Sequence, residues 1–329
     1  MAADALSDVL RTIRLNGAAF FDVTVRAPWV LAAPSSDKCA PYVMPQASHV
    51  IEYHVVTQGS CWAALAGEGT PVYLQTGDIY ILTQGDAHVL SSEPGMQTEP
   101  DMSIYRAPDN MQLPIPLVAG SGDGEEAHIV CGFLGYDAAS RHPLLDALPR
   151  IVHAPARTRG AGNWLDVFIP AAVAECENKR PGGESILARM SELMFVEVIR
   201  QYVENLPPAE RGWLAGLRDK SVGRALNLMH GRPAYCWTLE EMAAEVGLSR
   251  SSLAERFSDY VGCPPMQYLA NWRMQLATGL LSDGSASIAE IAERVGYDSE
   301  AAFSRAFKRN LGAAPATWRK SRRLAIAAE

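Results

Sequence analysis

The chain has 329 residues, of which 48% are hydrophobic and 20% charged, and its formal net charge is −8. This is the composition of an ordinary soluble globular protein, and the length allows two domains with separate cores. The sequence has no run of 18 or more apolar residues, so it is not expected to cross a membrane.

The chain begins with an acidic stretch in which Leu6, Val9, Leu10 and Ile13 recur at helical spacing. This pattern predicts an amphipathic helix rather than a signal peptide, which would need a basic start and a continuous apolar segment. The six cysteines are scattered without a C-x-x-C pair. They are therefore expected to be buried thiols in a reducing cytoplasm.

Residues 1–150 contain short segments rich in β-branched and aromatic residues and separated by Gly, Pro and Asp. This pattern is typical of an antiparallel sandwich or small barrel. The segments are residues 20–25, 29–33, 51–56, 61–66, 71–75, 78–83 and 128–136.

Two stretches of this region resemble the motifs of the cupin barrel. "LQTGDIYILTQGDAHVL", which contains His88, resembles the second motif, and "IEYHVVTQGSCWAAL", which contains His54, resembles the first. A small barrel can enclose one small ligand. The candidate effector contacts are Trp29, His54, Trp62, Tyr80 and His88, although each aromatic ring could equally be plain core.

The cupin resemblance also raises the question of a metal. Its full site would have H-x-H in the first motif, whereas this chain has E-x-H, formed by Glu52 and His54. These two side chains share one face of a strand. With His88 they would be an adequate ligand set for zinc or iron. The alternative is that the two histidines only bond each other and the strand backbone. No other cofactor is expected.

Residues 162–217 predict two helices interrupted by "KRPGG". The second has an apolar face too broad for an isolated surface helix, so it must pack on something. The partner is either the barrel or the C-terminal domain, or the same helix of a second subunit in a homodimer. The apolar face consists of Ile186, Met190, Leu193, Met194, Val198 and Ile199.

The last third of the chain repeats one pattern. Thr238 and Ser287 each precede a glutamate by three residues, which is a helix-capping box, and Gly247 and Gly296 can each end the short helix that follows. A second helix then completes each copy. This is the helix-turn-helix unit, whose second helix enters the DNA major groove. A helix ending near residues 283–284 would join the two copies. The alternative is a helical bundle that has no role with DNA.

The charge distribution is consistent with a polyanionic partner for this end of the chain. Residues 218–323 contain 15 basic and 11 acidic residues and carry +4, while the remainder carries −12. A solvated basic tail would give the same count.

"WTLEEMAAEVGLSRSSLAERFSDYVGCPPMQYLANWRM" and "SIAEIAERVGYDSEAAFSRAFKRNLGAAPATWRK" closely resemble the paired helix-turn-helix domain of AraC/XylS-type transcription regulators. The resemblance implies that the second helix of each unit reads bases, with Arg305 as the foremost base contact. Glu255 departs from the basic or amide residue that such proteins often place there. The implied DNA-binding residues are Arg250, Ser251, Ser252, Glu255, Glu300, Ala301, Ser304 and Arg305, with phosphate contacts from Lys308, Arg309 and Arg319.

The sequence therefore predicts an α+β protein with an N-terminal cupin-like antiparallel β-barrel and a C-terminal all-α domain of two helix-turn-helix units joined by a linker helix. The expected divisions are a sensing domain (1–155), a helical linker and dimerisation segment (156–217) and a DNA-binding domain (218–323). The expected function is cytoplasmic, effector-responsive regulation of transcription without catalysis. RNA polymerase would be a further partner of an activator. The alternatives are a metal-dependent cupin enzyme fused to a DNA-binding module and a DNA-binding protein with a merely structural N-terminal domain.

Overall fold

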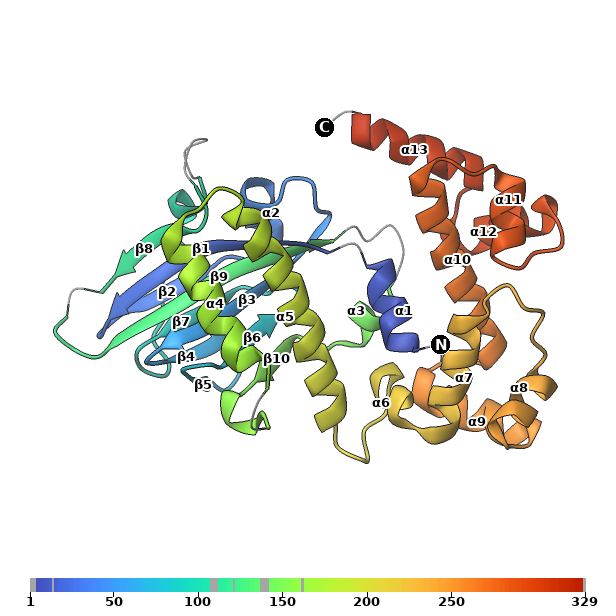
Figure 1. Cartoon of the computed structure of the whole chain (residues 1–329), viewed down its shortest axis with the longest axis horizontal. Coiled ribbons are helices and arrows are strands. Elements are labelled where there is room, and N and C mark those ends of the chain that lie inside the picture. Colours follow the sequence, from blue (N-terminus) through green and yellow to red (C-terminus); the bar gives the residue numbers. More distant parts are fainter. Residues whose placement is uncertain are drawn as a thin grey trace. The chain divides into compact units, whose positions relative to one another are not determined.

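The computed structural model describes residues 4–13, 15–106, 112–120, 122–136, 142–160 and 163–327. The chain divides into two compact units (Figure 1). The β unit contains the described parts of residues 14–137 and 148–202. The helical unit contains those of residues 1–13, 138–147 and 203–329. In the part of the chain that is described, no helix is both long and apolar enough to cross a membrane.

The described strands of the β unit form two sheets, with orders β10-β6-β3-β9-β1-β8 and β2-β7-β4-β5. All seven strand segments predicted from the sequence form strands. The strands are β1 (Asn16–Arg26), β2 (Val30–Ala33), β3 (His49–Gln58), β4 (Ser60–Leu65), β5 (Val72–Gln75), β6 (Ile79–Leu82), β7 (His88–Ser91), β8 (Ile115–Ala119), β9 (Glu126–Tyr136) and β10 (Ile151–Ala154).

The two sheets share one apolar core, to which Val56 and Phe133 contribute from the larger sheet and Cys61 and Leu74 from the smaller. The described strands give a cupin-like arrangement without closing into a single hydrogen-bonded ring. Their pairing is antiparallel as expected, except that β8 runs parallel to β1. A long connection separates β8 from β7, so no hairpin dictates its direction.

Helices α4 (Leu165–Asn178) and α5 (Gly183–Asn205) cover the outer face of the six-stranded sheet (Figure 1). Cys176 of α4 and Leu187 of α5 pack against Ala19 and Val130 of the sheet. The two helices separated by a short break are therefore confirmed. Their contacts group them with the β unit, whereas the predicted boundaries placed them in a separate linker. Short helices α2 (Ser36–Val43), η1 (Met102–Tyr105) and η2 (Ala156–Thr158) complete the described part of this unit.

The described helices of the helical unit come from three separate stretches of the chain. Helix α1 is the predicted N-terminal amphipathic helix. It packs on α7, where Ala5 and Val9 are fully buried and the Ala5 amide donates to Asn227 Oδ1 at 2.9 Å. The helices are α1 (Ala5–Thr12), α3 (Pro143–Ala147), α6 (Trp213–Arg218), α7 (Lys220–Gly231), α8 (Leu239–Val246), α9 (Arg250–Val261), α10 (Pro265–Asp283), α11 (Ile288–Arg294), α12 (Glu300–Leu311) and α13 (Pro315–Ala327).

The two repeat units form as their sequences predict. Thr238 caps α8 and Ser287 caps α11, each in a complete capping box with the glutamate three residues later. Gly247 and Gly296 follow these helices with φ of +72° and +86°, a backbone conformation that glycine adopts without strain. Helix α10 ends at Asp283, as expected, and joins the units.

The cysteines are all free. Cys39, Cys61, Cys131 and Cys176 are buried as predicted. The prediction is wrong for Cys236, which is exposed, and for Cys263, which is half-buried, because both lie in turns of the helical unit rather than in its core.

Candidate functional site

The first candidate site consists of the second helix of each repeat unit. Leu253 and Phe257 of α9 are fully buried, as are Phe303 and Phe307 of α12. Because these residues recur every four positions, they fix one face of each helix against its own unit and turn the opposite face to solvent. Each helix begins behind a serine whose side chain accepts an amide hydrogen bond from the first turn.

Most of the predicted base-reading and phosphate-contacting residues lie on these solvent-facing sides. Arg250 forms a 2.7 Å ion pair with Glu240, but both side chains are largely exposed, so the pair can exchange for another partner at little cost. Ser304 is half-buried. The exposed residues are Arg250, Ser251, Ser252, Glu255, Glu300, Ala301, Arg305, Lys308 and Arg309.

Arg319 is placed differently from the other predicted phosphate contacts. It is half-buried, and its Nη2 donates to the Ala286 carbonyl at 2.7 Å. The guanidinium therefore ties α13 to the residue just before the cap of α11. Its contact with phosphate stays a prediction.

The second candidate site is a cavity of about 310 Å³ in the β unit. Strands from both sheets line it, together with the segment around η1. Its walls are mostly apolar, and Glu52, His54 and His88 are its buried polar residues. The pattern of an apolar pocket with a few convergent polar groups is typical of small-molecule sites.

The polar groups of the cavity form a hydrogen-bonded chain. His54 Nε2 and His88 Nε2 lie 2.6 Å apart, His88 Nδ1 lies 2.9 Å from the Asp86 carbonyl, and His54 Nδ1 lies 2.9 Å from Cys131 Sγ. A carbonyl only accepts, so His88 carries its hydrogen on Nδ1 and accepts at Nε2. His54 must then donate from Nε2 and accept the Cys131 thiol hydrogen at Nδ1.

Burial sets the protonation of this cluster. It lowers the pKa of His54 well below its usual range, with a smaller contribution from His88, and lowers the pKa of His88 to about 4. Burial also raises the pKa of Glu52 to about 8 and that of the Cys131 thiol well above its usual range. Both imidazoles and the thiol are therefore neutral at pH 7, as the hydrogen-bonded chain requires.

Glu52 completes the predicted metal-ligand set, and the three ligating groups lie within 4.8 Å of one another. Glu52 Oε1 is 3.9 Å from Nε2 of both histidines. The chemical types of these ligands, one carboxylate and two imidazoles, suit zinc or iron. A tetrahedral zinc ion, however, would hold two nitrogens about 3.3 Å apart, given Zn–N distances of about 2.0–2.1 Å. The observed 2.6 Å is a hydrogen-bond distance, so the histidines as placed do not fit a metal and instead form the predicted histidine pair.

The aromatic residues predicted to contact an effector lie elsewhere. Trp29 and Tyr80 are buried in the core, and Trp62 packs on Tyr73 with ring centroids 5.0 Å apart. None of the three is among the described residues that line the cavity, whereas His54 and His88 are.

Sequence reasoning missed the aromatic and thiol groups that do line the cavity, namely Phe21, Tyr105 and Cys131. Phe21 and Cys131 belong to strand segments that the sequence predicted, and strand alternation could have suggested which of their residues face inward. Tyr105 belongs to η1, outside any strand pattern, and gave no such signal.

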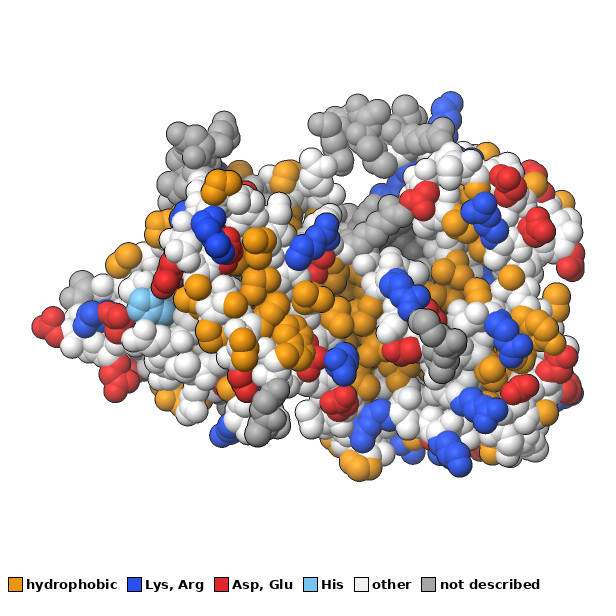
Figure 2. Space-filling view, viewed as in Figure 1, with side chains coloured by type: hydrophobic (Ala, Val, Ile, Leu, Met, Phe, Trp, Pro, Cys, Tyr) orange, Lys and Arg blue, Asp and Glu red, His pale blue; other side chains and the backbone are white. Residues whose placement is uncertain are grey.

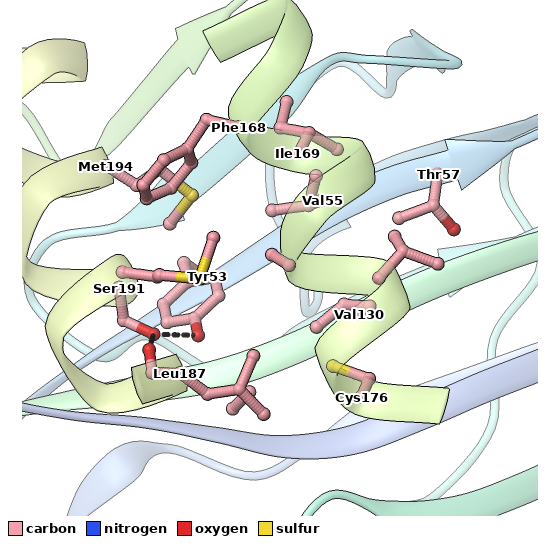
Figure 3. Close-up of a pocket in the computed structure, with 14 residues that line it drawn as sticks. Tyr53, Val55, Thr57, Val130, Phe168, Ile169, Cys176, Leu187, Ser191 and Met194 are labelled. Carbon is pink, nitrogen blue, oxygen red and sulfur yellow. Dashed lines mark hydrogen bonds between the residues drawn. The ribbon is translucent and has the colours of Figure 1, made fainter. Parts of the chain in front are cut away.

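A second hollow of about 40 Å³ lies between the outer face of the larger sheet and helices α4 and α5 (Figure 3). Its lining is almost entirely apolar. The exceptions are Thr57 and the pair of Tyr53 and Ser191, in which the Tyr53 hydroxyl and Ser191 Oγ lie 2.6 Å apart. The hollow has room for only a few water molecules. It is therefore a packing gap rather than an effector site.

Two helix-turn-helix units with exposed second helices, and a separate β unit with a ligand-sized cavity, define the class of a DNA-binding regulator with an additional N-terminal domain. Comparison with known proteins agrees. Residues 4–204 match the cupin family and residues 242–321 match a helix-turn-helix domain family.

The chain is 36% identical over 277 residues to a putative AraC-like transcription regulator of Streptomyces lividans, covering 83% of this chain and 88% of that protein. It is 32% identical over 318 residues to one of Streptomyces antibioticus, covering 96% and 98%. It is also 28% identical over 318 residues to the regulator AlkR of Acinetobacter baylyi, covering 96% and 98%. The chain belongs to the AraC-like transcription regulators with an N-terminal cupin domain.

Proposed function

We propose that a small molecule bound in the cavity of the β unit changes the affinity of the helix-turn-helix units for DNA. The observation that carries this proposal is a cavity of about 310 Å³ whose buried floor holds Glu52, His54 and His88. An effector can shift the DNA-bound population only as far as its affinity differs between the free and DNA-bound arrangements. The protein then acts by binding, without catalysis.

The DNA contacts follow from the exposed faces of α9 and α12. Arg305 can bond guanine O6 and N7 with both arms of its guanidinium, and Glu255 can accept from cytosine N4. Lys308, Arg309 and Arg319 would contact phosphates, which position the protein without reading sequence. Since its DNA partner lies in the cytoplasm, the protein would act there, and RNA polymerase would be a further partner if it activates.

A homodimer is supported by the surface of α4 and α5. Met194, Val198 and Ile199 of the predicted apolar face are buried, and Met194 lies against the sheet, so the barrel accounts for part of the face. Ile186 and Leu193 stay 47% and 54% exposed. Val167 of α4 and Trp164 just before it are exposed, and hydrophobic side chains gather over these helices in Figure 2. Such a surface is typical of a protein interface.

The test is recovery of genomic fragments bound to the purified protein at ordinary salt. We expect a shared bipartite motif with its halves about one helical turn, about 34 Å, apart, because each unit reads one major groove. Ala33→Phe should narrow the cavity, because Ala33 pairs with His88 and so shares the sheet face that lines it. This variant should keep the motif but lose any change in DNA binding that added cell extract, as a source of effector, produces. Effector-dependent binding that survives Ala33→Phe would place the effector outside the cavity.

The second candidate function is a metal-dependent cupin enzyme joined to a DNA-binding module. The three ligand groups lie within 4.8 Å of one another, but His54 and His88 would have to move apart from their 2.6 Å separation to bind a metal. Metal analysis of the purified protein tests it: stoichiometric zinc or iron that is lost in His88→Ala would support this function, and a metal-free protein that still binds DNA would reject it.

A further inference from the structure

The described lining of the cavity offers acidic side chains but no cationic one. Its described lining includes three carboxyl side chains, Glu52, Glu99 and Asp101, and neither lysine nor arginine. Glu99 and Asp101 are exposed at its edge, whereas Glu52 is buried. A carboxylate or phosphate ligand would meet like charge there and find no cationic partner, which makes its transfer from water costly.

Glu52 has an unmet need for a hydrogen-bond partner. It is only 2% exposed, and its Oε2 has no partner among the described residues. The neighbouring imidazoles cannot supply one, because His54 and His88 use their ring nitrogens for each other, Cys131 and the Asp86 carbonyl. Since buried polar atoms are nearly always bonded, the donor is expected to come from an occupant of the cavity.

The other residues that line the cavity indicate the chemistry of the rest of that ligand. The rings of Phe21 and Tyr105 meet edge to face with centroids 5.4 Å apart, and Val23, Leu90 and Leu117 add aliphatic surface. These groups suit an apolar body, and aromatic rings also favour a nearby positive charge.

We propose that the cavity binds a small organic ammonium ion with an apolar body, whose N–H groups donate to the carboxyl group of Glu52 and whose positive charge favours the ionised form of that group. This proposal rests on the cavity being the effector site and adds the chemical class of the effector. A metal ion is the other cation that three such ligands could hold, but the histidines already bond each other at 2.6 Å. An ammonium ion needs only Glu52 and leaves that pair intact.

The test compares three probes on each of two carbon skeletons, using the full chain. They are benzylamine, benzyl alcohol and benzoate, and cyclohexylmethylamine with its alcohol and carboxylate. Calorimetry should show that each amine binds about tenfold to a hundredfold tighter than its alcohol, the gain typical of a charge-assisted hydrogen bond. Carboxylates should bind weakest.

Glu52→Gln should remove the preference for amine over alcohol, and Glu177→Gln, an exposed change on α4, should leave it intact. If Glu52→Gln fails to fold, Asp101→Asn provides a second readout, and amines should then bind more weakly while alcohols do not change. Amines that bind no tighter than their alcohols on both skeletons would overturn the proposal.

Other outcomes separate this proposal from the proposed function. Alcohols or carboxylates that bind best, with binding lost in Ala33→Phe, would overturn the ammonium class but keep the cavity as effector site. Probe binding that is unaffected by Ala33→Phe would overturn both. Stoichiometric zinc or iron released by Glu52→Gln, together with no amine preference, would assign the cation to a metal and overturn the proposal.

Discussion

Arg305 and Lys308 lie one turn apart on α12, and both are exposed, yet we expect them to act differently on DNA. Arg305→Ala should cost about 1–3 kcal/mol of specific binding and relax the preference at one base position. Lys308→Ala should weaken binding to specific and random DNA alike. It should also reduce the slope of log affinity against log salt concentration by about one unit. Fluorescence anisotropy across a salt series measures both. If Arg305→Ala lost the same affinity for specific and random DNA, Arg305 would be a phosphate contact and not a base contact.

His230 makes the stability of the helical unit depend on pH. Its Nε2 bonds the Tyr268 hydroxyl at 2.8 Å, and burial lowers its pKa to about 3. Because the folded pKa lies below the unfolded one, the stabilisation is present above about pH 6.5 and is lost as pH falls toward 3. At pH 5 the loss is about 2 kcal/mol.

His230→Gln keeps a partner for Tyr268 but cannot titrate. Between pH 7 and pH 5 the wild type should therefore lose about 2 kcal/mol more of its free energy of unfolding than His230→Gln does. Urea unfolding at the two pH values measures this difference. His49→Gln, which changes a histidine at an exposed strand end, is the control and should follow the wild type. An unchanged pH profile in His230→Gln would show that His230 is not the group responsible.

At the scale of elements, the two repeat units offer a matched comparison. Gly247 and Gly296 hold equivalent positions with positive φ. A Cβ added at Gly247 would meet nothing within 4 Å, whereas one at Gly296 would lie 2.6 Å from the Ala234 Cα. The first glycine is thus required by the backbone alone and the second also by close packing.

Gly247→Ala should cost about 1–2 kcal/mol, the strain of a left-handed alanine. Gly296→Ala should cost at least about 1 kcal/mol more, because the backbone at Ala234 must move. Urea unfolding of both variants measures the difference. Equal losses in the free energy of unfolding would mean that the backbone at Ala234 moves aside without a measurable loss of stability.

At the scale of the whole molecule, we expect the exposed apolar surface of α4 and α5 to form the interface of a homodimer. Leu193→Glu places a charge among the exposed apolar side chains and should weaken a homodimer by about tenfold or more, since a charge buried in an interface needs a partner. Tyr73→Glu, on the exposed side of β5, is the matched control. Sedimentation equilibrium measures both, and a dimer that survives Leu193→Glu unchanged would place the interface elsewhere.

The sequence by itself determined the parts of the fold that depend on local signals. The capping boxes at Thr238 and Ser287, the glycines that follow α8 and α11, and the end of α10 at Asp283 all lie where the sequence predicts them. Each depends on a few neighbouring residues, through hydrogen bonds to the first turn or the freedom of glycine at positive φ. Seven of the ten described strands were equally readable, because alternation and turn residues are also local, whereas β7, β8 and β10 were not predicted as strands.

Only the tertiary structure decided which distant segments meet. It paired β8 in parallel with β1, packed α1 on α7, and placed Trp29, Trp62 and Tyr80 away from the cavity while bringing Tyr105 and Cys131 to it. It also set the 2.6 Å separation of His54 and His88, which favours a hydrogen bond over a metal. A local pattern fixes which face of a strand is buried, but the residues that share a cavity are chosen by the packing of segments far apart in the chain.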